Sequence, residues 1–415
     1  MSTFTVIFVA TMVAGLALQL WLVSRQAAHI ITHRKTVPPD FAGSISLEQH
    51  QKAASYSLAR LALERWDLVV GALILLGWTL GGGLGWLDSA IASVIADPLW
   101  SGVLLVITAV LIGGLLELPL SVWRTFSIEE NFGFNRTTPI GFIKDRLLDV
   151  LLTLILGVPL VAVILWLMGS TGRHWWLWAW LVWMGFSLFV TWAYPIWIAP
   201  LFNRFKPLDD ASLRSRLEAL LRRCGFRSNG MFVMDGSRRS AHGNAYFTGF
   251  GSNKRIVFFD TLLQGLSANE VEAVLAHELG HFKRRHVAKM LALSSVMALL
   301  GLGLLGWLSQ QGWFYSGLGV GRATPALALV LFMFVLPVFT VFVSPLSAML
   351  SRRHEFEADD FAAEHSDPRH LISGLVKMYR DNASTLTPDP LYSAFHHSHP
   401  PAALRIAHLS TKIPA

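Results

Sequence analysis

Seven apolar stretches, each about 20 residues long, dominate the chain and are long enough to cross the hydrocarbon core of a bilayer as helices. The composition agrees, since 53% of the residues are hydrophobic and 15% are charged, whereas a soluble domain carries about 25% charged residues. The first stretch has neither a cationic start nor a small-residue cleavage site, so we expect it to remain as a span. The predicted transmembrane helices are 4–23, 68–87, 102–122, 149–169, 176–198, 288–308 and 325–346.

The distribution of Lys and Arg predicts how this bundle is oriented. Loops after the odd-numbered stretches are basic, whereas 88–101 has no Lys or Arg and the two other even-numbered loops have one Arg each. Because positive loops stay in the cytoplasm, we expect the N-terminus outside and the segment 199–287 and the C-terminus inside. The net charge of +7 is then explained by these loops and by contact with anionic membrane lipids, and not by binding to nucleic acid.

A metal-binding pattern, V-L-A-H-E-L-G-H-F, lies between the fifth and sixth stretches. His277 and His281 are four residues apart, so on a helix both imidazoles face the same way and can bind one zinc ion. Glu278 then lies beside the open coordination position, where it can take a proton from a water molecule. Ser267 and Glu270 suit the start of this helix, as a cap and an acidic residue three positions later.

The third zinc ligand has to come from elsewhere in the chain. The metzincin pattern is excluded, because Arg284 and Val287 stand where its Gly and last His should be. His286 lies one residue too early for that pattern, and we interpret it as an interfacial residue at the start of the sixth span. The remaining possibility is a gluzincin, in which a glutamate from a second helix downstream completes the site.

The segment S-R-R-H-E-F-E-A-D-D-F-A-A-E-H follows the seventh stretch and reads as a polar helix. His354, Glu355 and Glu357 are all residues that could bind zinc. Glu355 and Asp359 share one helix face, which suits a ligand and a carboxylate that orients a zinc-bound imidazole. The alternative is a solvated acidic helix that pairs with neighbouring arginines.

Short strands are predicted between the fifth stretch and the metal helix, at 231–234, 244–248 and 256–259. If the second strand lies at the edge of a sheet, its backbone can hold an extended peptide substrate by antiparallel hydrogen bonds, whatever the peptide side chains are. Asn244, Ala245 and Tyr246 are the candidates for this role; the alternative is an ordinary scaffold strand. His242 and His399 are candidates to donate a hydrogen bond to the oxyanion, although a lone loop histidine is more often structural.

The paired H-E-L-G-H and S-R-x-x-E-F-x-A-D segments, in a seven-span chain, resemble the type 1 CAAX prenyl proteases. These are membrane zinc endopeptidases that process farnesylated a-factor and prelamin A. The similarity continues in T-V-P-P-D-F (36–41), N-F-G-F-N-R-T-T (131–138), S-A-H-G-N-A-Y-F-T-G (240–249) and D-P-L-Y-S-A-F-H-H-S-H-P-P (389–401).

This resemblance implies that Glu355 is the third ligand and Asp359 its supporting carboxylate, within a large chamber enclosed by helices. It also implies that His399 and Arg405 act near the substrate, because the family carries His-Pro followed by Arg. One departure is Leu404, which replaces the Glu that commonly precedes that Arg.

We therefore predict an all-α integral membrane protein with seven transmembrane helices and a gluzincin-type zinc protease domain that contains a small β-sheet. The division is 1–198 for the first five helices, 199–287 for the protease segment, 288–346 for the last two helices and 347–415 for the third ligand. The predicted activity is a metalloendopeptidase with one zinc ion, cleaving C-terminal, prenylated or membrane-associated substrates in a bacterial inner membrane. The alternatives are a quality-control protease similar to HtpX and a non-catalytic scaffold or transporter.

Overall fold

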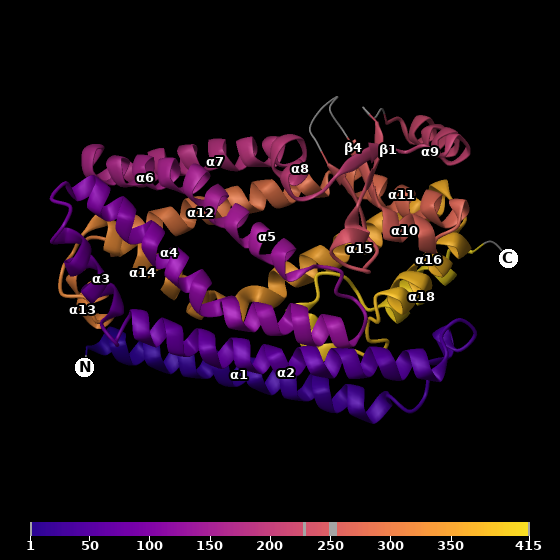
Figure 1. The fold of residues 1–415 in the computed structure, drawn as a ribbon, viewed down its shortest axis with the longest axis horizontal. Coiled ribbons are helices and arrows are strands. Elements are labelled where there is room, and N and C mark those ends of the chain that lie inside the picture. Colours follow the sequence, from indigo (N-terminus) through magenta and orange to yellow (C-terminus); the bar gives the residue numbers. More distant parts are fainter. Residues whose placement is uncertain (1, 227–229, 249–254, 414–415) are drawn as a thin grey trace.

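The computed structural model describes residues 2–226, 230–248 and 255–413, with the side chains of 247 and 248 excluded. It is an elongated bundle in which the N-terminus lies at one end of the long axis, and the small sheet and the C-terminus lie at the other (Figure 1). This arrangement puts the predicted protease segments together at one end of the membrane helices.

Six helical segments are long and apolar enough to cross a membrane, or seven if one bent pair counts as a single span, within the described part of the chain. They combine α-helices with short π-helical stretches at Arg124–Glu129, Thr153–Gly157 and Tyr194–Ile198. The α-helices of these segments are α1 (Thr3–His33), α2 (Leu47–Trp78) with α3 (Gly83–Ala92), α4 (Pro98–Trp123), α5 (Pro139–Leu152) with α6 (Val158–Ser170), α7 (Trp175–Ala193) with α8 (Ala199–Phe202), α12 (His286–Leu308), and α14 (Pro325–Thr340) with α15 (Ser344–His365).

The bent pair is the predicted second span, which breaks between α2 and α3 at an angle of 49°. Three consecutive glycines follow Leu80, and Gly82 adopts a φ of 77°, a left-handed conformation that residues with a side chain rarely adopt. The glycines therefore end α2 and let the chain turn into α3.

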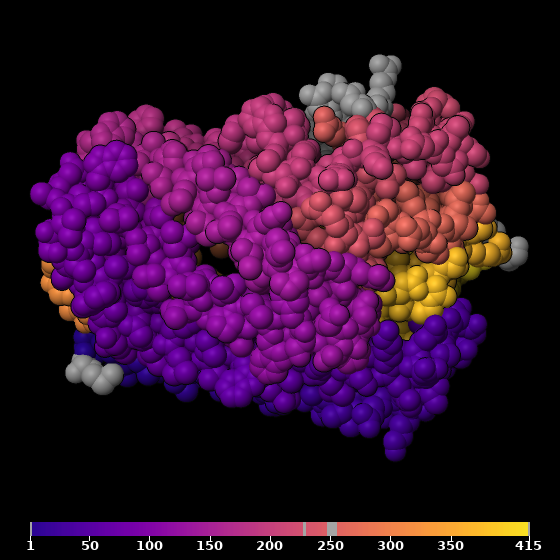
Figure 2. Space-filling model, in the orientation of Figure 1, coloured from indigo at the N-terminus to yellow at the C-terminus, as the bar shows by residue number. Residues whose placement is uncertain are grey.

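The membrane helices are longer than the apolar stretches that predicted them. The segment Pro98–Glu129 has 32 residues, which is about 48 Å of helix against a hydrocarbon core of about 30 Å. Similarly, α2 begins at Leu47, far before the predicted residue 68. The surplus helix carries polar residues beyond the predicted hydrocarbon region. Figure 2 shows an opening in one face of the molecule among the helices of the N-terminal half.

The small sheet has four strands in the order β1-β2-β4-β3. β2 (Met231–Met234) pairs in parallel with β4 (Arg255–Phe259), while β1 (Phe205–Pro207) and β3 (Ala245–Thr248) are antiparallel to their neighbours. The predicted strands are present, and β1 is an addition. β3 lies at one edge of the sheet, as the assignment of Asn244, Ala245 and Tyr246 to peptide binding requires.

Two separate apolar cores support these parts. One is formed by the membrane helices, and the other packs the sheet and α9 against the helices around the metal-binding motif. The proposed division at 198, 287 and 346 stays a prediction. The remaining helices are α9 (Ala211–Cys224), α10 (Asp260–Gly265), α11 (Ala268–Lys283), α13 (Gly312–Gly317), α16 (Pro368–Asp381), α17 (Pro390–His396) and α18 (Ala402–Ser410).

Candidate active site

The helix that carries the H-E-L-G-H motif is α11, and its start is formed as the sequence predicts. Ser267 caps the helix, and the side chain of Glu270 reaches back to the backbone N–H of Ser267 at 2.7 Å, completing a capping box. Glu270 is buried and also accepts hydrogen bonds from Ser373 at 2.6 Å and Lys377 at 2.7 Å, both on α16. These contacts fix where α11 begins, and hence where its two histidines point.

Gly280 lets α11 approach α15 closely enough to complete the site. A Cβ at Gly280 would lie 2.9 Å from the Cα of Ala358 and 3.0 Å from its carbonyl oxygen, so no larger residue fits without moving one helix. Ala358 lies on α15 between Glu355 and Asp359. The Gly of the motif therefore sets the separation between the two helices that supply the predicted ligands.

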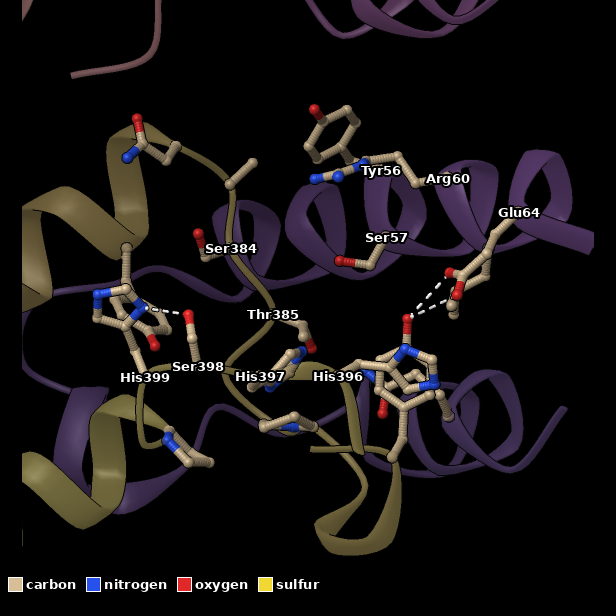
Figure 3. Close-up of a pocket in the computed structure, with 18 residues that line it drawn as sticks. Tyr56, Ser57, Arg60, Glu64, Ser384, Thr385, His396, His397, Ser398 and His399 are labelled. Carbon is tan, nitrogen blue, oxygen red and sulfur yellow. Dashed lines mark hydrogen bonds between the residues drawn. The ribbon is translucent and has the colours of Figure 1, made fainter. Parts of the chain in front are cut away.

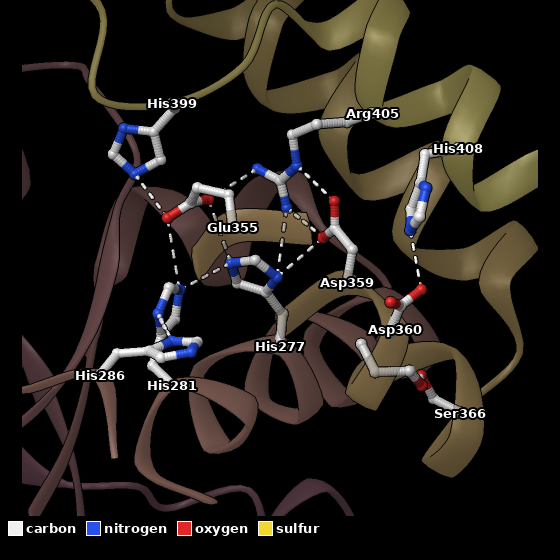
Figure 4. Close-up of polar contacts among 11 residues, drawn as sticks. His277, His281, His286, Glu355, Asp359, Asp360, Ser366, His399, Arg405 and His408 are labelled. Carbon is white, nitrogen blue, oxygen red and sulfur yellow. Dashed lines mark hydrogen bonds and ion pairs between the residues drawn. The ribbon is translucent and has the colours of Figure 1, made fainter. Parts of the chain in front are cut away.

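His277, His281 and Glu355 converge on one point (Figure 4). The Nε2 atoms of the two histidines are 3.3 Å apart, and the Glu355 carboxylate oxygens lie 3.5 Å from Nε2 of His277 and 3.4 Å from Nε2 of His281. One potential ligand atom from each residue lies within 4.8 Å of the others. Two helices that are far apart in the sequence thus bring together two imidazoles and one carboxylate.

The chemistry of this cluster fits a zinc ion. Two imidazole nitrogens and a carboxylate oxygen are the three protein ligands of zinc hydrolases that keep a fourth position open. In addition, Oε2 of Glu355 is buried and accepts no hydrogen bond among the described residues. Its nearest charged neighbours are Nε2 of His277 and Nη1 of Arg405, both 3.5 Å away, so this oxygen still has room to bind a metal ion.

Asp359 and Arg405 hold His277 from behind. Nδ1 of His277 lies 2.9 Å from Oδ1 of Asp359, so the imidazole donates its proton there and leaves Nε2 free for a metal. Arg405 in turn donates to both Asp359 oxygens, from Nε at 2.8 Å and from Nη2 at 2.5 Å. Burial and the Arg405 charge lower the pKa of His277, but hydrogen bonds to Asp359 and Glu355 outweigh them and raise it to about 9.

His281 is held by a second set of contacts, which joins it to His286 and Glu357. Nδ1 of His281 lies 3.0 Å from Nδ1 of His286, and Nε2 of His286 lies 3.0 Å from Oε2 of Glu357. His286 is the first residue of α12, but it is 3% exposed and stacks on His354 with the ring centroids 4.0 Å apart. It is therefore a buried partner of a predicted ligand as well as the first residue of the sixth span, a contact that the sequence did not predict.

Glu357, which the sequence offered as one of three possible zinc ligands, is predicted to tune zinc affinity through His286. We expect Glu357→Gln to weaken zinc binding by about 10-fold, because loss of a carboxylate that orients a ligand costs 10- to 100-fold and the amide can still accept one hydrogen bond. Competition with a fluorescent chelator measures the effect. Arg353→Gln removes an exposed partner of Glu357 and should change little. Zinc affinity within twofold of wild type in Glu357→Gln would contradict this role.

Glu278 lies beside the cluster, on the face of α11 next to His277. It is only partly exposed, and burial raises its pKa above the ordinary range of a carboxyl group, against the opposing effect of the two histidines. A carboxylate with a raised pKa accepts a proton more readily near neutral pH. The position and environment of Glu278 therefore suit a general base.

The two histidines that were candidates for oxyanion stabilisation lie in different places. Nε2 of His399 is 3.4 Å from Oε1 of Glu355, and its side chain is 65% exposed, so it stands beside the predicted ligands on their open side. His242 instead stacks on Phe134 and lies 3.4 Å from Glu129 and 3.3 Å from Asn382. The structure brings His399 to the cluster and shows no contact between His242 and a predicted ligand.

The residues predicted to bind substrate also lie in two different places. Asn244 is exposed and immediately precedes β3, with Ala245 and Tyr246 in the edge strand, and β3 contacts α11. Arg405 is 6% exposed and lies behind the ligands, where its guanidinium is occupied by Asp359 and lies 3.5 Å from Glu355. The geometry thus favours a supporting role for Arg405 over direct contact with a substrate.

Comparison with known families matches both halves of the chain. Residues 26–204 match the CAAX prenyl protease N-terminal family, described by five membrane helices, and residues 207–413 match peptidase family M48. The chain is 34% identical to the CAAX prenyl protease 1 homolog of Arabidopsis thaliana, covering 89% of each protein. It is 30% identical to the human homolog, covering 98% of this chain and 95% of the human one. The chain belongs to the CAAX prenyl protease 1 family.

The fold leads to the same family. Ste24p of S. mikatae superimposes with a TM-score of 0.92 over 99% of both chains at 28% sequence identity. The protein is therefore an integral-membrane metalloprotease of the CAAX prenyl protease 1 type. The resemblance stated from the motifs is confirmed, and the HtpX-like alternative is not favoured, because the match includes the N-terminal membrane domain. The family implies a metal, and the cluster of His277, His281 and Glu355 can hold one.

Proposed function

We propose that the protein is a zinc endopeptidase that cleaves peptide bonds near the C-terminus of prenylated or membrane-associated proteins. One zinc ion would be held by His277, His281 and Glu355, with Asp359 and Arg405 supporting His277 from behind. The observation that carries this proposal is the convergence of the three potential ligand atoms within 4.8 Å of one another. When bound, zinc would polarise the scissile carbonyl and lower the pKa of a nearby water molecule.

Other groups of the protein carry out proton transfer, oxyanion stabilisation and substrate alignment. Glu278 takes the proton of the attacking water and returns it to the leaving amine, which its raised pKa favours. His399 donates a hydrogen bond to the negative charge that develops on the scissile carbonyl oxygen. The backbone of Asn244, Ala245 and Tyr246 aligns the extended peptide. His242 supports the wall of the site through Glu129 and Asn382, a role that its contacts favour over oxyanion stabilisation.

We propose that the end of the bundle bearing the sheet faces the cytoplasm and the N-terminus faces outside. The basic loops support this orientation by their charge, since positively charged loops remain on the cytoplasmic side. The N-terminus and the protease end lie at opposite ends of the long axis, consistent with this orientation (Figure 1). A bacterial inner membrane stays a prediction from the sequence.

The role of lipid is tested by a pair of peptides that differ only in a farnesyl group on the cysteine. We expect the purified protein to cleave the farnesylated peptide with the higher kcat/KM, because its apolar chain can remain among the membrane helices while the peptide lies on β3. Cleavage is measured by mass spectrometry of the released C-terminal fragment. Equal rates for both peptides would contradict recognition of the lipid, and cleavage of neither would contradict the proposed activity.

A further inference from the structure

A cavity of about 370 Å³, lined by both polar and apolar side chains, lies beside His399. It is lined by α2, the end of α16 and the segment that carries His399, whose Nε2 lies 3.4 Å from Glu355. Its volume falls in the range of about 300–1,000 Å³ that is usual for ligand pockets. Figure 3 shows the side chains of both walls turned towards the same space. The cavity therefore begins where the reacting bond of a substrate would lie.

The one Lys or Arg that lines this cavity among the described residues is Arg60, whose charge acts on Glu64 and Glu129 without a direct ion pair to either. Among the described residues that line the cavity, the charged ones are Arg60 and Glu64, both on α2. Glu64 accepts hydrogen bonds from the Tyr392 hydroxyl at 2.9 and 3.2 Å. The nearby Glu129 accepts one from Tyr56 at 2.6 Å. No ion pair involves Arg60 within the described part of the chain; its guanidinium lies over the Tyr56 ring, 5.6 Å from the centroid.

The direction of β3 determines which end of a bound peptide would reach this cavity. Asn382 lines the cavity and holds the backbone of Gly243, with its Oδ1 3.0 Å from the Gly243 nitrogen. The cavity thus meets β3 at its N-terminal end. A peptide that pairs antiparallel with β3 runs the opposite way, so its C-terminal residues point towards Asn382 and the cavity.

We propose that the cavity binds the C-terminal residues of the substrate and that Arg60 pairs with the free carboxylate at the end of the peptide. This inference rests on the proposed peptidase function and adds to it a requirement for a free C-terminus close to the scissile bond. A guanidinium presents several N–H donors in a plane and matches a carboxylate in charge and geometry. The hydroxyls and histidines of the other wall can hydrogen-bond the short peptide leading up to it.

The test compares two peptides of identical sequence, one ending in a free carboxylate and one in a carboxamide, with the zinc-loaded full-length protein. We expect wild type to cleave the free acid with a kcat/KM about 10- to 100-fold higher than that for the carboxamide, because only the acid can form a hydrogen-bonded charge pair with Arg60. Arg60→Gln should bring kcat/KM for the acid down to the level of the amide, while the zinc content stays at the wild-type value. Arg60→Lys should keep part of the preference. The matched control is Arg65→Gln, an exposed cation of the same helix outside the cavity, which should keep all of it.

The outcomes separate this inference from the proposed function on which it rests. If wild type cleaves both peptides equally well, or if Arg60→Gln slows both by the same factor, the carboxylate assignment is overturned while the peptidase activity stands. A preference for the acid that survives in Arg60→Gln overturns it as well. If zinc-loaded wild type cleaves neither peptide, the proposed function fails and this inference fails with it.

Discussion

Replacing Glu278 with glutamine should reduce peptide cleavage by about 10²- to 10⁴-fold while leaving zinc bound. The glutamine keeps the shape of the side chain but cannot take a proton from water, and general base catalysis contributes a factor of that size. The three predicted ligands and the contacts of Asp359 are untouched by this change. Steady-state kinetics on a C-terminal peptide, together with metal analysis of the same preparation, measures both quantities.

The matched control for this experiment is Glu364→Gln. Glu364 is an exposed carboxylate on α15 that has no ion pair among the described residues, so its loss should leave kcat and zinc content at wild-type values. A Glu278→Gln protein that cleaves at the wild-type rate would show that another group removes the proton. A variant that loses zinc as well would show that Glu278 itself holds the metal.

Replacing Glu355 with alanine should abolish both zinc binding and cleavage. The change removes one of three ligands and leaves His277 and His281 alone, so zinc affinity should fall by more than the 10- to 100-fold that follows loss of an outer partner. Because zinc binds the folded protein, adding it should raise the melting temperature of wild type and not that of Glu355→Ala. Metal analysis should find about one zinc per wild-type chain.

Asp360→Ala provides the control on the same helix. Asp360 points away from the cluster, where it binds His408 at 2.7 Å and Lys412 at 2.9 Å. Its loss should lower stability slightly and leave zinc affinity unchanged. If Glu355→Ala retains a full equivalent of zinc with wild-type affinity, Glu355 is not a ligand, and the choice among His354, Glu355 and Glu357 reopens.

Local patterns in the sequence were sufficient to predict much of the fold. The apolar stretches located the membrane helices, because about 20 apolar residues have few other stable environments. They did not give the helix ends, since helices such as α2 continue into polar sequence where hydropathy carries no signal. The strand β1 was missed because its three residues, Phe205–Pro207, are too few for a periodic pattern and end in proline.

The candidate site shows the same division between local and distant contacts. The spacing of His277 and His281 fixes their common face within one helix, so it could be read from the sequence. The contact of His286 with Glu357 joins residues 71 positions apart, so no local sequence pattern predicts it. The same holds for the burial of Arg405, because only the packing of α18 against α15 places its side chain behind the ligands.

X-ray absorption at the zinc edge of the purified wild-type protein identifies the atoms that bind the metal. We expect a zinc ion bound by two imidazole nitrogens and by carboxylate and solvent oxygens, at distances of about 2.0–2.2 Å. The only cysteine, Cys224, is buried in the core around α9, so no sulfur ligand is expected. Zinc with a sulfur neighbour at about 2.3 Å, or a fully active protein that contains no metal, would rule out a catalytic zinc ion bound by His277, His281 and Glu355.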